Sequence, residues 1–144
     1  MQSSTTLSET TSSGPAAIPR VLLVDDSQVM LTWTVSVLMP DCSVVGAVTS
    51  GKAAIEAARH LEPDVIVLDI SMPGMSGLEI AGHLRRAGSK AALVFLTIHE
   101  EPEFIQAAMG VGAFGYVIKR KVTVDLIEAV RAALARRQFV SSTR

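Results

Sequence analysis

Short apolar runs alternate with longer stretches of helical spacing along the chain from Arg20 onward. Each run has the length of a strand and is rich in aliphatic and β-branched residues, and each longer stretch carries an apolar stripe. The runs predict strands at residues 21–24, 43–46, 65–68, 92–96 and 114–118, and helices at 28–39, 51–61, 77–87, 102–111 and 122–137. Such continuous apolar strands are typical of a parallel sheet covered by helices on both faces. The pattern therefore predicts an α/β fold, (βα)5, with a doubly wound five-stranded parallel sheet.

The composition is that of one folded domain preceded by a polar N-terminal segment. The 144 residues are 49% hydrophobic and 19% charged, which is enough apolar material for one core. Ser and Thr dominate residues 1–19, so we expect a flexible tail there and a domain at 20–141. No apolar run approaches the ~18 to 20 residues that span a bilayer, and the start lacks the features of a secretory signal. We therefore expect a cytoplasmic protein without a membrane partner.

Charge and cysteine content exclude several further classes of protein. Thirteen basic and fourteen acidic residues give a net charge of -1, which argues against a surface built throughout to coat nucleic acid. The single cysteine, Cys42, excludes an intramolecular disulfide, and the three histidines are too scattered for a zinc site. These counts are consistent with a reducing compartment.

Ionisable residues follow several of the predicted strands. Asp25 and Asp26 come directly after the first strand, and Asp69 comes directly after the third. In an open α/β sheet the ligand site lies beyond the carboxyl ends of the strands, where these residues would meet. Three clustered carboxylates are a suitable oxygen ligand set for Mg²⁺. For Asp25 and Asp26 alone, a favourable interaction with the positive end of the following helix is an equally good interpretation.

Two more polar residues end strands at the same edge of the sheet. Thr97 follows the fourth predicted strand and Lys119 follows the fifth, and each alone would be an ordinary strand-end residue. Together with the carboxylates they supply a hydroxyl and an ammonium group, which can stabilise a phosphoryl group in transit. Asp69 is the candidate nucleophile, and it would form an aspartyl phosphate.

Four segments carry a resemblance to a known family. They are VLLVDDS at 21–27, PDVIVLDISMPGMSGLE at 63–79, LT at 96–97 and GAFGYVIK at 112–119. On these segments residues 20–141 resemble the receiver domain of a two-component response regulator, and the NarL-like subfamily is the most similar. The resemblance implies a CheY-like, flavodoxin-like fold. It also implies a signalling protein that turns over no free substrate, so we do not expect an enzyme.

The resemblance also implies roles for individual residues. These are Asp69 as phosphoacceptor, Asp25, Asp26, Asp69 and the backbone carbonyl of Ser71 as Mg²⁺ ligands, Thr97 and Lys119 as phosphoryl-binding groups, and Thr97 with Tyr116 as the switch pair. The implied donor is a phosphohistidine on a sensor histidine kinase or a histidine phosphotransfer protein. A homodimer on activation is a further implication of the resemblance.

Three positions bear on how this chain differs from other members of the family. Arg120 follows Lys119, where many receivers have a proline. Ser71 and His99 stand two residues after Asp69 and Thr97, at positions that flank the attacking water in the family. Because Ser71 has no amide to orient that water and Ile98 can narrow the entrance, our hypothesis is slow self-dephosphorylation.

Two other functions compete with a stand-alone receiver. From Gly115 onward there are seven basic residues and two acidic ones, so the chain can be the receiver part of a truncated DNA-binding transcriptional regulator. For the charges themselves, a solvated helix with cations at its C-terminal end is the simpler explanation. We expect no output domain within these residues, and hence no direct contact with nucleic acid. A remote alternative is a nucleotide-binding enzyme, since residues 46–53 read GxxxxGKA, one residue short of a P-loop.

The first predicted helix offers a candidate partner surface. Met30, Trp33, Val37 and Leu38 have the spacing of a core-facing stripe. Leu31 and Val35 are also apolar and lie four residues apart on the flank of that stripe. We predict that these two side chains are exposed and contact the phosphodonor. Incidental exposure of apolar surface is the alternative.

Overall fold

Strands and helices alternate through a computed structural model that describes residues 18–143. The strands are β1 (Arg20–Val24), β2 (Ser43–Val48), β3 (Val65–Leu68), β4 (Ala92–Thr97), β5 (Gly115–Ile118) and β6 (Phe139–Val140). The helices are α2 (Gln28–Leu38), α3 (Gly51–Leu61), α4 (Gly77–Arg86), α5 (Pro102–Gly110) and α6 (Val122–Leu134), with a 3₁₀ turn, η1 (Lys119–Lys121), before the last. The prediction of a flexible tail at 1–19 falls almost wholly outside the described residues.

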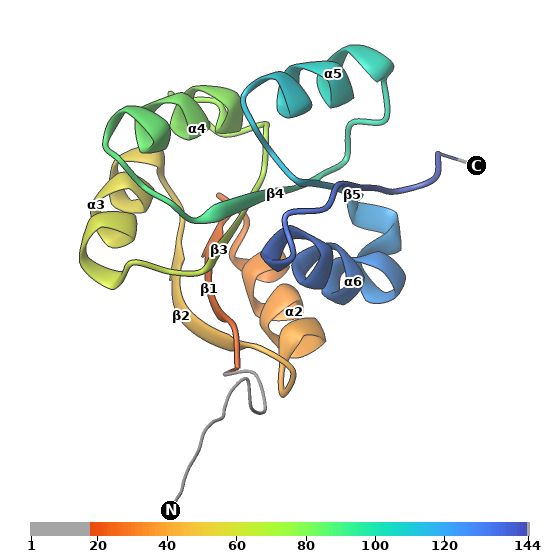
Figure 1. Ribbon diagram of the computed structural model, residues 1–144, viewed down its shortest axis with the longest axis horizontal. Helices are drawn as coiled ribbons and strands as arrows, with labels where there is room; N and C mark the ends of the chain where they lie inside the picture. The colour runs from red at the N-terminus through yellow and green to blue at the C-terminus, as the bar shows by residue number, and fades with distance from the viewer. Residues whose placement is uncertain (1–17, 144) are drawn as a thin grey trace, which may run out of the picture.

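The sheet lies between two helical layers (Figure 1). All strands are parallel, in the order β2-β1-β3-β4-β5-β6. One core cluster joins the sheet to α2 and α6, and the other joins it to α3, α4 and α5. The strands β3, β4 and β5 are buried along their whole length, which explains their continuous apolar sequences. The predicted doubly wound α/β fold is confirmed.

Register brings the carboxyl ends of the central strands together. Val24 of β1 pairs with Leu68 of β3, so the residues that follow them, Asp25 and Asp69, are neighbours. Thr97 of β4 pairs with Ile118, the residue before Lys119. The strand order reverses between β1 and β3, which is where ligands bind in sheets of this type.

The C-terminal region differs from the sequence prediction. We expected a helix at 122–137, but α6 ends at Leu134 and the chain returns along β5 as a sixth strand, so the sheet is larger than predicted. Arg136 adopts a left-handed conformation with a φ of 58°, which stops the helix without a glycine. A two-residue strand after a basic helix end has no sequence signature strong enough to be recognised.

The predicted exposed stripe on α2 is wrong. Leu31 is 3% exposed and packs in the core, and Val35 packs partly against the same cluster. The helix turns Leu31, Thr34 and Leu38, spaced three and four residues apart, toward the sheet. Trp33, predicted to face inward, is instead 46% exposed.

Candidate functional site

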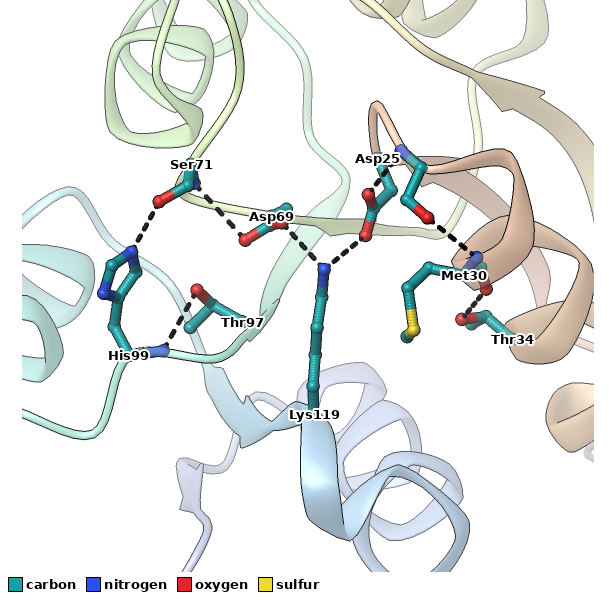
Figure 2. Close-up of polar contacts among 9 residues, drawn as sticks. Asp25, Met30, Thr34, Asp69, Ser71, Thr97, His99 and Lys119 are labelled. Atoms are coloured by element: carbon teal, nitrogen blue, oxygen red, sulfur yellow. Dashed lines mark hydrogen bonds and ion pairs between the residues drawn. The ribbon is translucent and has the colours of Figure 1, made fainter.

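Three side chains from three strand ends meet at the centre of the site (Figure 2). The Lys119 Nζ atom lies 2.9 Å from Asp25 Oδ2 and 2.9 Å from Asp69 Oδ2. The side chains of Asp25, Asp69 and Lys119 are only 8%, 6% and 14% exposed, so water screens these charges weakly. The lysine therefore bridges two carboxylates that would otherwise repel each other.

Asp26 completes the acidic cluster from a more exposed position. Carboxylate oxygens of Asp25, Asp26 and Asp69 lie within 4.8 Å of one another. Three carboxylates against one ammonium leave a surplus of two negative charges in a partly buried space. A divalent cation with oxygen ligands would neutralise that surplus, so the residues present fit Mg²⁺.

Backbone contacts orient both buried carboxylates. The Ser27 N–H donates to Asp25 Oδ1 at 2.9 Å, and the Ser71 N–H donates to Asp69 Oδ1 at 3.3 Å. Gly77 allows the start of α4 to pack against the backbone of Asp69, because a Cβ atom there would lie 1.9 Å from the Asp69 carbonyl oxygen. These contacts fix the loops on either side of the cluster.

Opposing effects act on the pKa of Lys119. Desolvation lowers the pKa of the ammonium group, but hydrogen bonds and charge attraction from Asp69 and Asp25 outweigh it. The pKa of Lys119 is consequently raised above its ordinary value, and the side chain is charged at neutral pH. The site thus holds a permanent cation beside Asp69.

His99 connects the loops on the other side of Asp69. Its Nε2 atom lies 2.5 Å from Ser71 Oγ, and its ring stacks on Phe104 of α5 with centroids 4.1 Å apart. The His99 N–H also donates to the Thr97 hydroxyl at 3.4 Å (Figure 2). Thr97 is fully buried, and the loop that carries His99 shields its hydroxyl from solvent. The positions of Ser71 and His99 were noted from the sequence, but their contact has no sequence signal.

Tyr116 is buried below the same loop. Its hydroxyl donates to the His99 carbonyl oxygen at 2.8 Å, and its side chain is inaccessible to solvent. Desolvation, with the charges of Glu101 and Asp69, raises the pKa of Tyr116 to about 12. Both members of the predicted switch pair, Thr97 and Tyr116, are therefore hydrogen-bonded to the backbone of His99.

Arg120 makes a contact that sequence reasoning missed. Its guanidinium group donates to both carboxylate oxygens of Glu100 at 2.9 Å, which joins the β5–α6 connection to the β4–α5 loop. The hydrogen bond to Arg120 lowers the pKa of Glu100. The only sequence signal was the departure from proline at this position.

The P-loop-like segment does not form a phosphate-binding loop. Gly46 lies within β2, where it pairs with Leu22. Only Thr49 and Ser50 separate β2 from α3, and Ser50 caps that helix through its side chain. This two-residue connection between β2 and α3 is too short to surround a phosphate chain, so the nucleotide-binding alternative is wrong.

Fold and site together define a class of α/β proteins with a buried acidic cluster and a lysine at the carboxyl ends of a parallel sheet. The family model of the response regulator receiver domain matches residues 21–131. The chain belongs to this family and is the receiver domain of a two-component response regulator. Proteins of this kind act in signalling.

Known relatives agree with this assignment. The nitrate/nitrite response regulator NarL of Escherichia coli strain K12 is 35% identical over 123 residues, which cover 84% of this chain and 57% of NarL. NarP of the same strain is 38% identical over 121 residues, which cover 82% of this chain and 56% of NarP. The chain thus spans less than two thirds of the length of these relatives.

Solved structures show the same fold. A LuxR-family two-component response regulator from Aurantimonas sp. SI85-9A1 is 29% identical, with a TM-score of 0.80, over 88% of this chain and 91% of that one. The response regulator domain of Thermotoga maritima CheB is 30% identical, with a TM-score of 0.76, over 83% of this chain and 98% of that one. Within residues 18–143, none of the helices is both long and apolar enough to cross a membrane.

Proposed function

We propose that Asp69 accepts a phosphoryl group from a phosphohistidine and that the resulting aspartyl phosphate carries the signal. The observation that supports this most strongly is the position of Lys119, whose Nζ atom is 2.9 Å from an Asp69 carboxylate oxygen. A fixed cation beside a buried carboxylate can balance charge as a phosphoryl group arrives. Residues 20–141 form the proposed receiver unit, which includes β6.

Asp25, Asp26 and Asp69 would hold Mg²⁺, together with the backbone carbonyl of Ser71. The support for this set is the cluster of carboxylate oxygens within 4.8 Å of one another. When bound, the ion supplies positive charge for the oxygens of the phosphoryl group. The chain's own cation, Lys119, lies on the Asp25 and Asp69 side of the cluster.

The transfer step forms one bond and breaks one bond. An Asp69 carboxylate oxygen attacks phosphorus, the bond from phosphorus to the imidazole nitrogen of the donor breaks, and the electron pair leaves with the imidazole. Lys119 follows the negative charge onto a phosphoryl oxygen, and the Thr97 hydroxyl donates to another. The donor would be a sensor histidine kinase or a histidine phosphotransfer protein.

Thr97 and Tyr116 would pass the change to α5 and β5. A Thr97 hydroxyl that turns toward the phosphoryl group gives up the hydrogen bond from His99, whose carbonyl oxygen also accepts from Tyr116. Movement of the His99 loop would then alter the surface around α5, because His99 stacks on Phe104. A homodimer on activation would use this altered surface.

The donor would dock on α2 through Val29 and Trp33. These side chains are 77% and 46% exposed and lie four residues apart, close to Asp25 and Asp26 in the chain. They replace Leu31, which is buried. Trp33→Glu should slow transfer from the cognate kinase. The control His60→Glu changes an exposed residue of α3, on the other side of the sheet, and should not slow it. Equal rates in both variants would exclude this docking site.

The relatives suggest an output function that this receiver would control. NarL and NarP are response regulators for nitrate and nitrite, and a related structure is described as RcsB dimers bound to DNA. By analogy the second candidate is the receiver part of a DNA-binding transcriptional regulator. The support for this candidate is that both relatives are response regulators in which this chain matches the receiver part.

The proposed transfer is tested by intact-mass measurement after incubation with acetyl phosphate and Mg²⁺. The parent protein should gain the mass of one phosphoryl group, and the gain should be lost when Mg²⁺ is chelated. Asp69→Ala should gain nothing, whereas Asp41→Ala, at an exposed position away from the site, should behave as the parent. An equal gain in Asp69→Ala would contradict the proposal.

A further inference from the structure

Residues 139–143 lie along β5 and reach the switch residue. The Phe139 N–H donates to the Phe114 carbonyl at 2.8 Å, and the Ser141 N–H donates to the Tyr116 carbonyl at 2.8 Å. The strand β6 runs parallel to β5, and so toward the carboxyl ends of the strands, where Asp69 lies. A strand of two residues is held weakly by its own ladder, so other contacts must fix it.

Ser141 provides one of those contacts. Its side chain hydroxyl donates to Asp125 Oδ2 at 2.7 Å and accepts from the Ile118 N–H at 3.2 Å. Ser141 is 3% exposed, and Ile118 is the residue directly before Lys119. Loss of this hydroxyl would leave two polar groups without their partner in a buried place, which favours release of the segment.

Arg120 provides the second contact and connects the segment to the phosphorylation site. The Nη2 atom of Arg120 donates both to Glu100 Oε1 at 2.9 Å and to the Thr143 carbonyl at 3.2 Å. Glu100 follows His99 in the loop above Asp69, and Arg120 follows Lys119. Arg120 and Glu100 therefore lie on the two segments that a phosphoryl group on Asp69 would contact.

We propose that residues 139–143, which begin with β6, form a segment whose docking on β5 is weakened by phosphorylation of Asp69, through the ion pair between Arg120 and Glu100. This inference rests on the proposed function of Asp69. A phosphoryl group takes over the Asp69 oxygen that Lys119 now contacts, and it draws the Thr97 hydroxyl away from the His99 loop. Because the fork of Arg120 meets both Glu100 oxygens, small opposite movements of the two segments break its geometry and release the Thr143 carbonyl.

Coupling of this kind acts in both directions. If a phosphoryl group weakens docking of the segment, then a variant with weakened docking binds a phosphoryl mimic more tightly, by up to the same factor. Ser141→Ala should therefore bind beryllofluoride more tightly than the parent. The matched control is Ser43→Ala, which changes an exposed serine at the start of the opposite edge strand, β2.

The test is hydrogen exchange measured by mass spectrometry on the full chain, before and after treatment with acetyl phosphate and Mg²⁺. Intact mass first establishes the fraction phosphorylated. Exchange in peptides that cover 139–143 should rise about fivefold in the phosphorylated parent, the lower end of ordinary coupling between sites. It should not change in Asp69→Ala.

Two variants test whether the ion pair between Arg120 and Glu100 transmits the effect of phosphorylation to residues 139–143. Arg120→Gln should raise exchange in 139–143 without phosphate and should lose most of the further rise after phosphorylation. Arg137→Gln, a control at an exposed basic residue after α6, should respond as the parent. A full rise in Arg120→Gln would overturn the proposed route.

The outcomes of the exchange experiment are distinguishable. Phosphorylated parent protein with unchanged or lowered exchange in 139–143 overturns the coupling and leaves the proposed function standing. If no phosphoryl group is added to the parent, the proposed function fails and the coupling fails with it.

Discussion

Lys119 and Arg120 are neighbours in the chain, yet they lie in different electrostatic surroundings. The Lys119 side chain is 14% exposed and bridges two buried carboxylates, whereas Arg120 is 47% exposed and pairs with a partly exposed Glu100. Burial makes the contacts of Lys119 with Asp25 and Asp69 costly to break, because an unpaired charge would be left in a poorly solvated place. Water and salt screen the second pair, so it can open and close at little cost. The buried cation, Lys119, therefore suits charge balance, whereas the exposed cation, Arg120, suits a movable contact.

The largest effect is expected when the buried cation is removed. Lys119→Gln leaves Asp25 and Asp69 facing each other without a bridging charge, so the free energy of unfolding should fall by about 3 kcal/mol. Urea unfolding in metal-free buffer measures this change. Phosphorylation by acetyl phosphate should also slow by about 100-fold, since a group that stabilises the transferred charge is lost. A variant as stable and as reactive as the parent would show that the bridge has no such role.

Tyr116 tests the buried side of the site by its titration. It is the single tyrosine of the chain, so ultraviolet absorbance follows its ionisation directly. The midpoint should lie near pH 12 in the folded protein and near pH 10 in urea. Because the folded-state pKa is raised, this group's contribution to stability is complete below about pH 10 and is lost as the pH rises toward 12. A midpoint near 10 in the folded protein would place the hydroxyl in water.

Ser71 lies at the boundary between the buried and exposed regions. Its hydroxyl is occupied by His99, and it carries no amide to orient an attacking water. The aspartyl phosphate should therefore persist well beyond seconds, and Ser71→Asn should shorten its lifetime by about tenfold by positioning that water. Time-resolved intact mass after removal of acetyl phosphate measures both lifetimes. A lifetime of seconds in the parent would contradict the hypothesis of slow self-dephosphorylation.

The smallest effect on stability is expected at the exposed pair. Arg120→Gln should leave the urea midpoint close to that of the parent, because both partners are solvated and screened. The same variant should still accept a phosphoryl group at the parent rate. A large loss of stability would show that the pair is structural, which would remove the contrast with Lys119.

The fold was predictable because its signals are local. Apolar runs without a polar break predicted the central strands β3, β4 and β5, and polar residues after them located the site edge. The direction of Leu31 and Trp33 could not be predicted, because α2 is apolar on more than one side and packing alone decides which side faces the sheet. The contacts of Arg120 and Ser141 depend on the return of the chain along β5, which is a tertiary event.

Asp69, and no other residue, should capture the phosphoryl group. The most direct test is peptide mapping of the protein after treatment with acetyl phosphate and Mg²⁺, with the aspartyl phosphate reduced by borohydride to mark its position. We predict a mark at Asp69 alone. A mark at Asp25 or Asp26, or none in protein that has gained phosphoryl mass, would contradict the account.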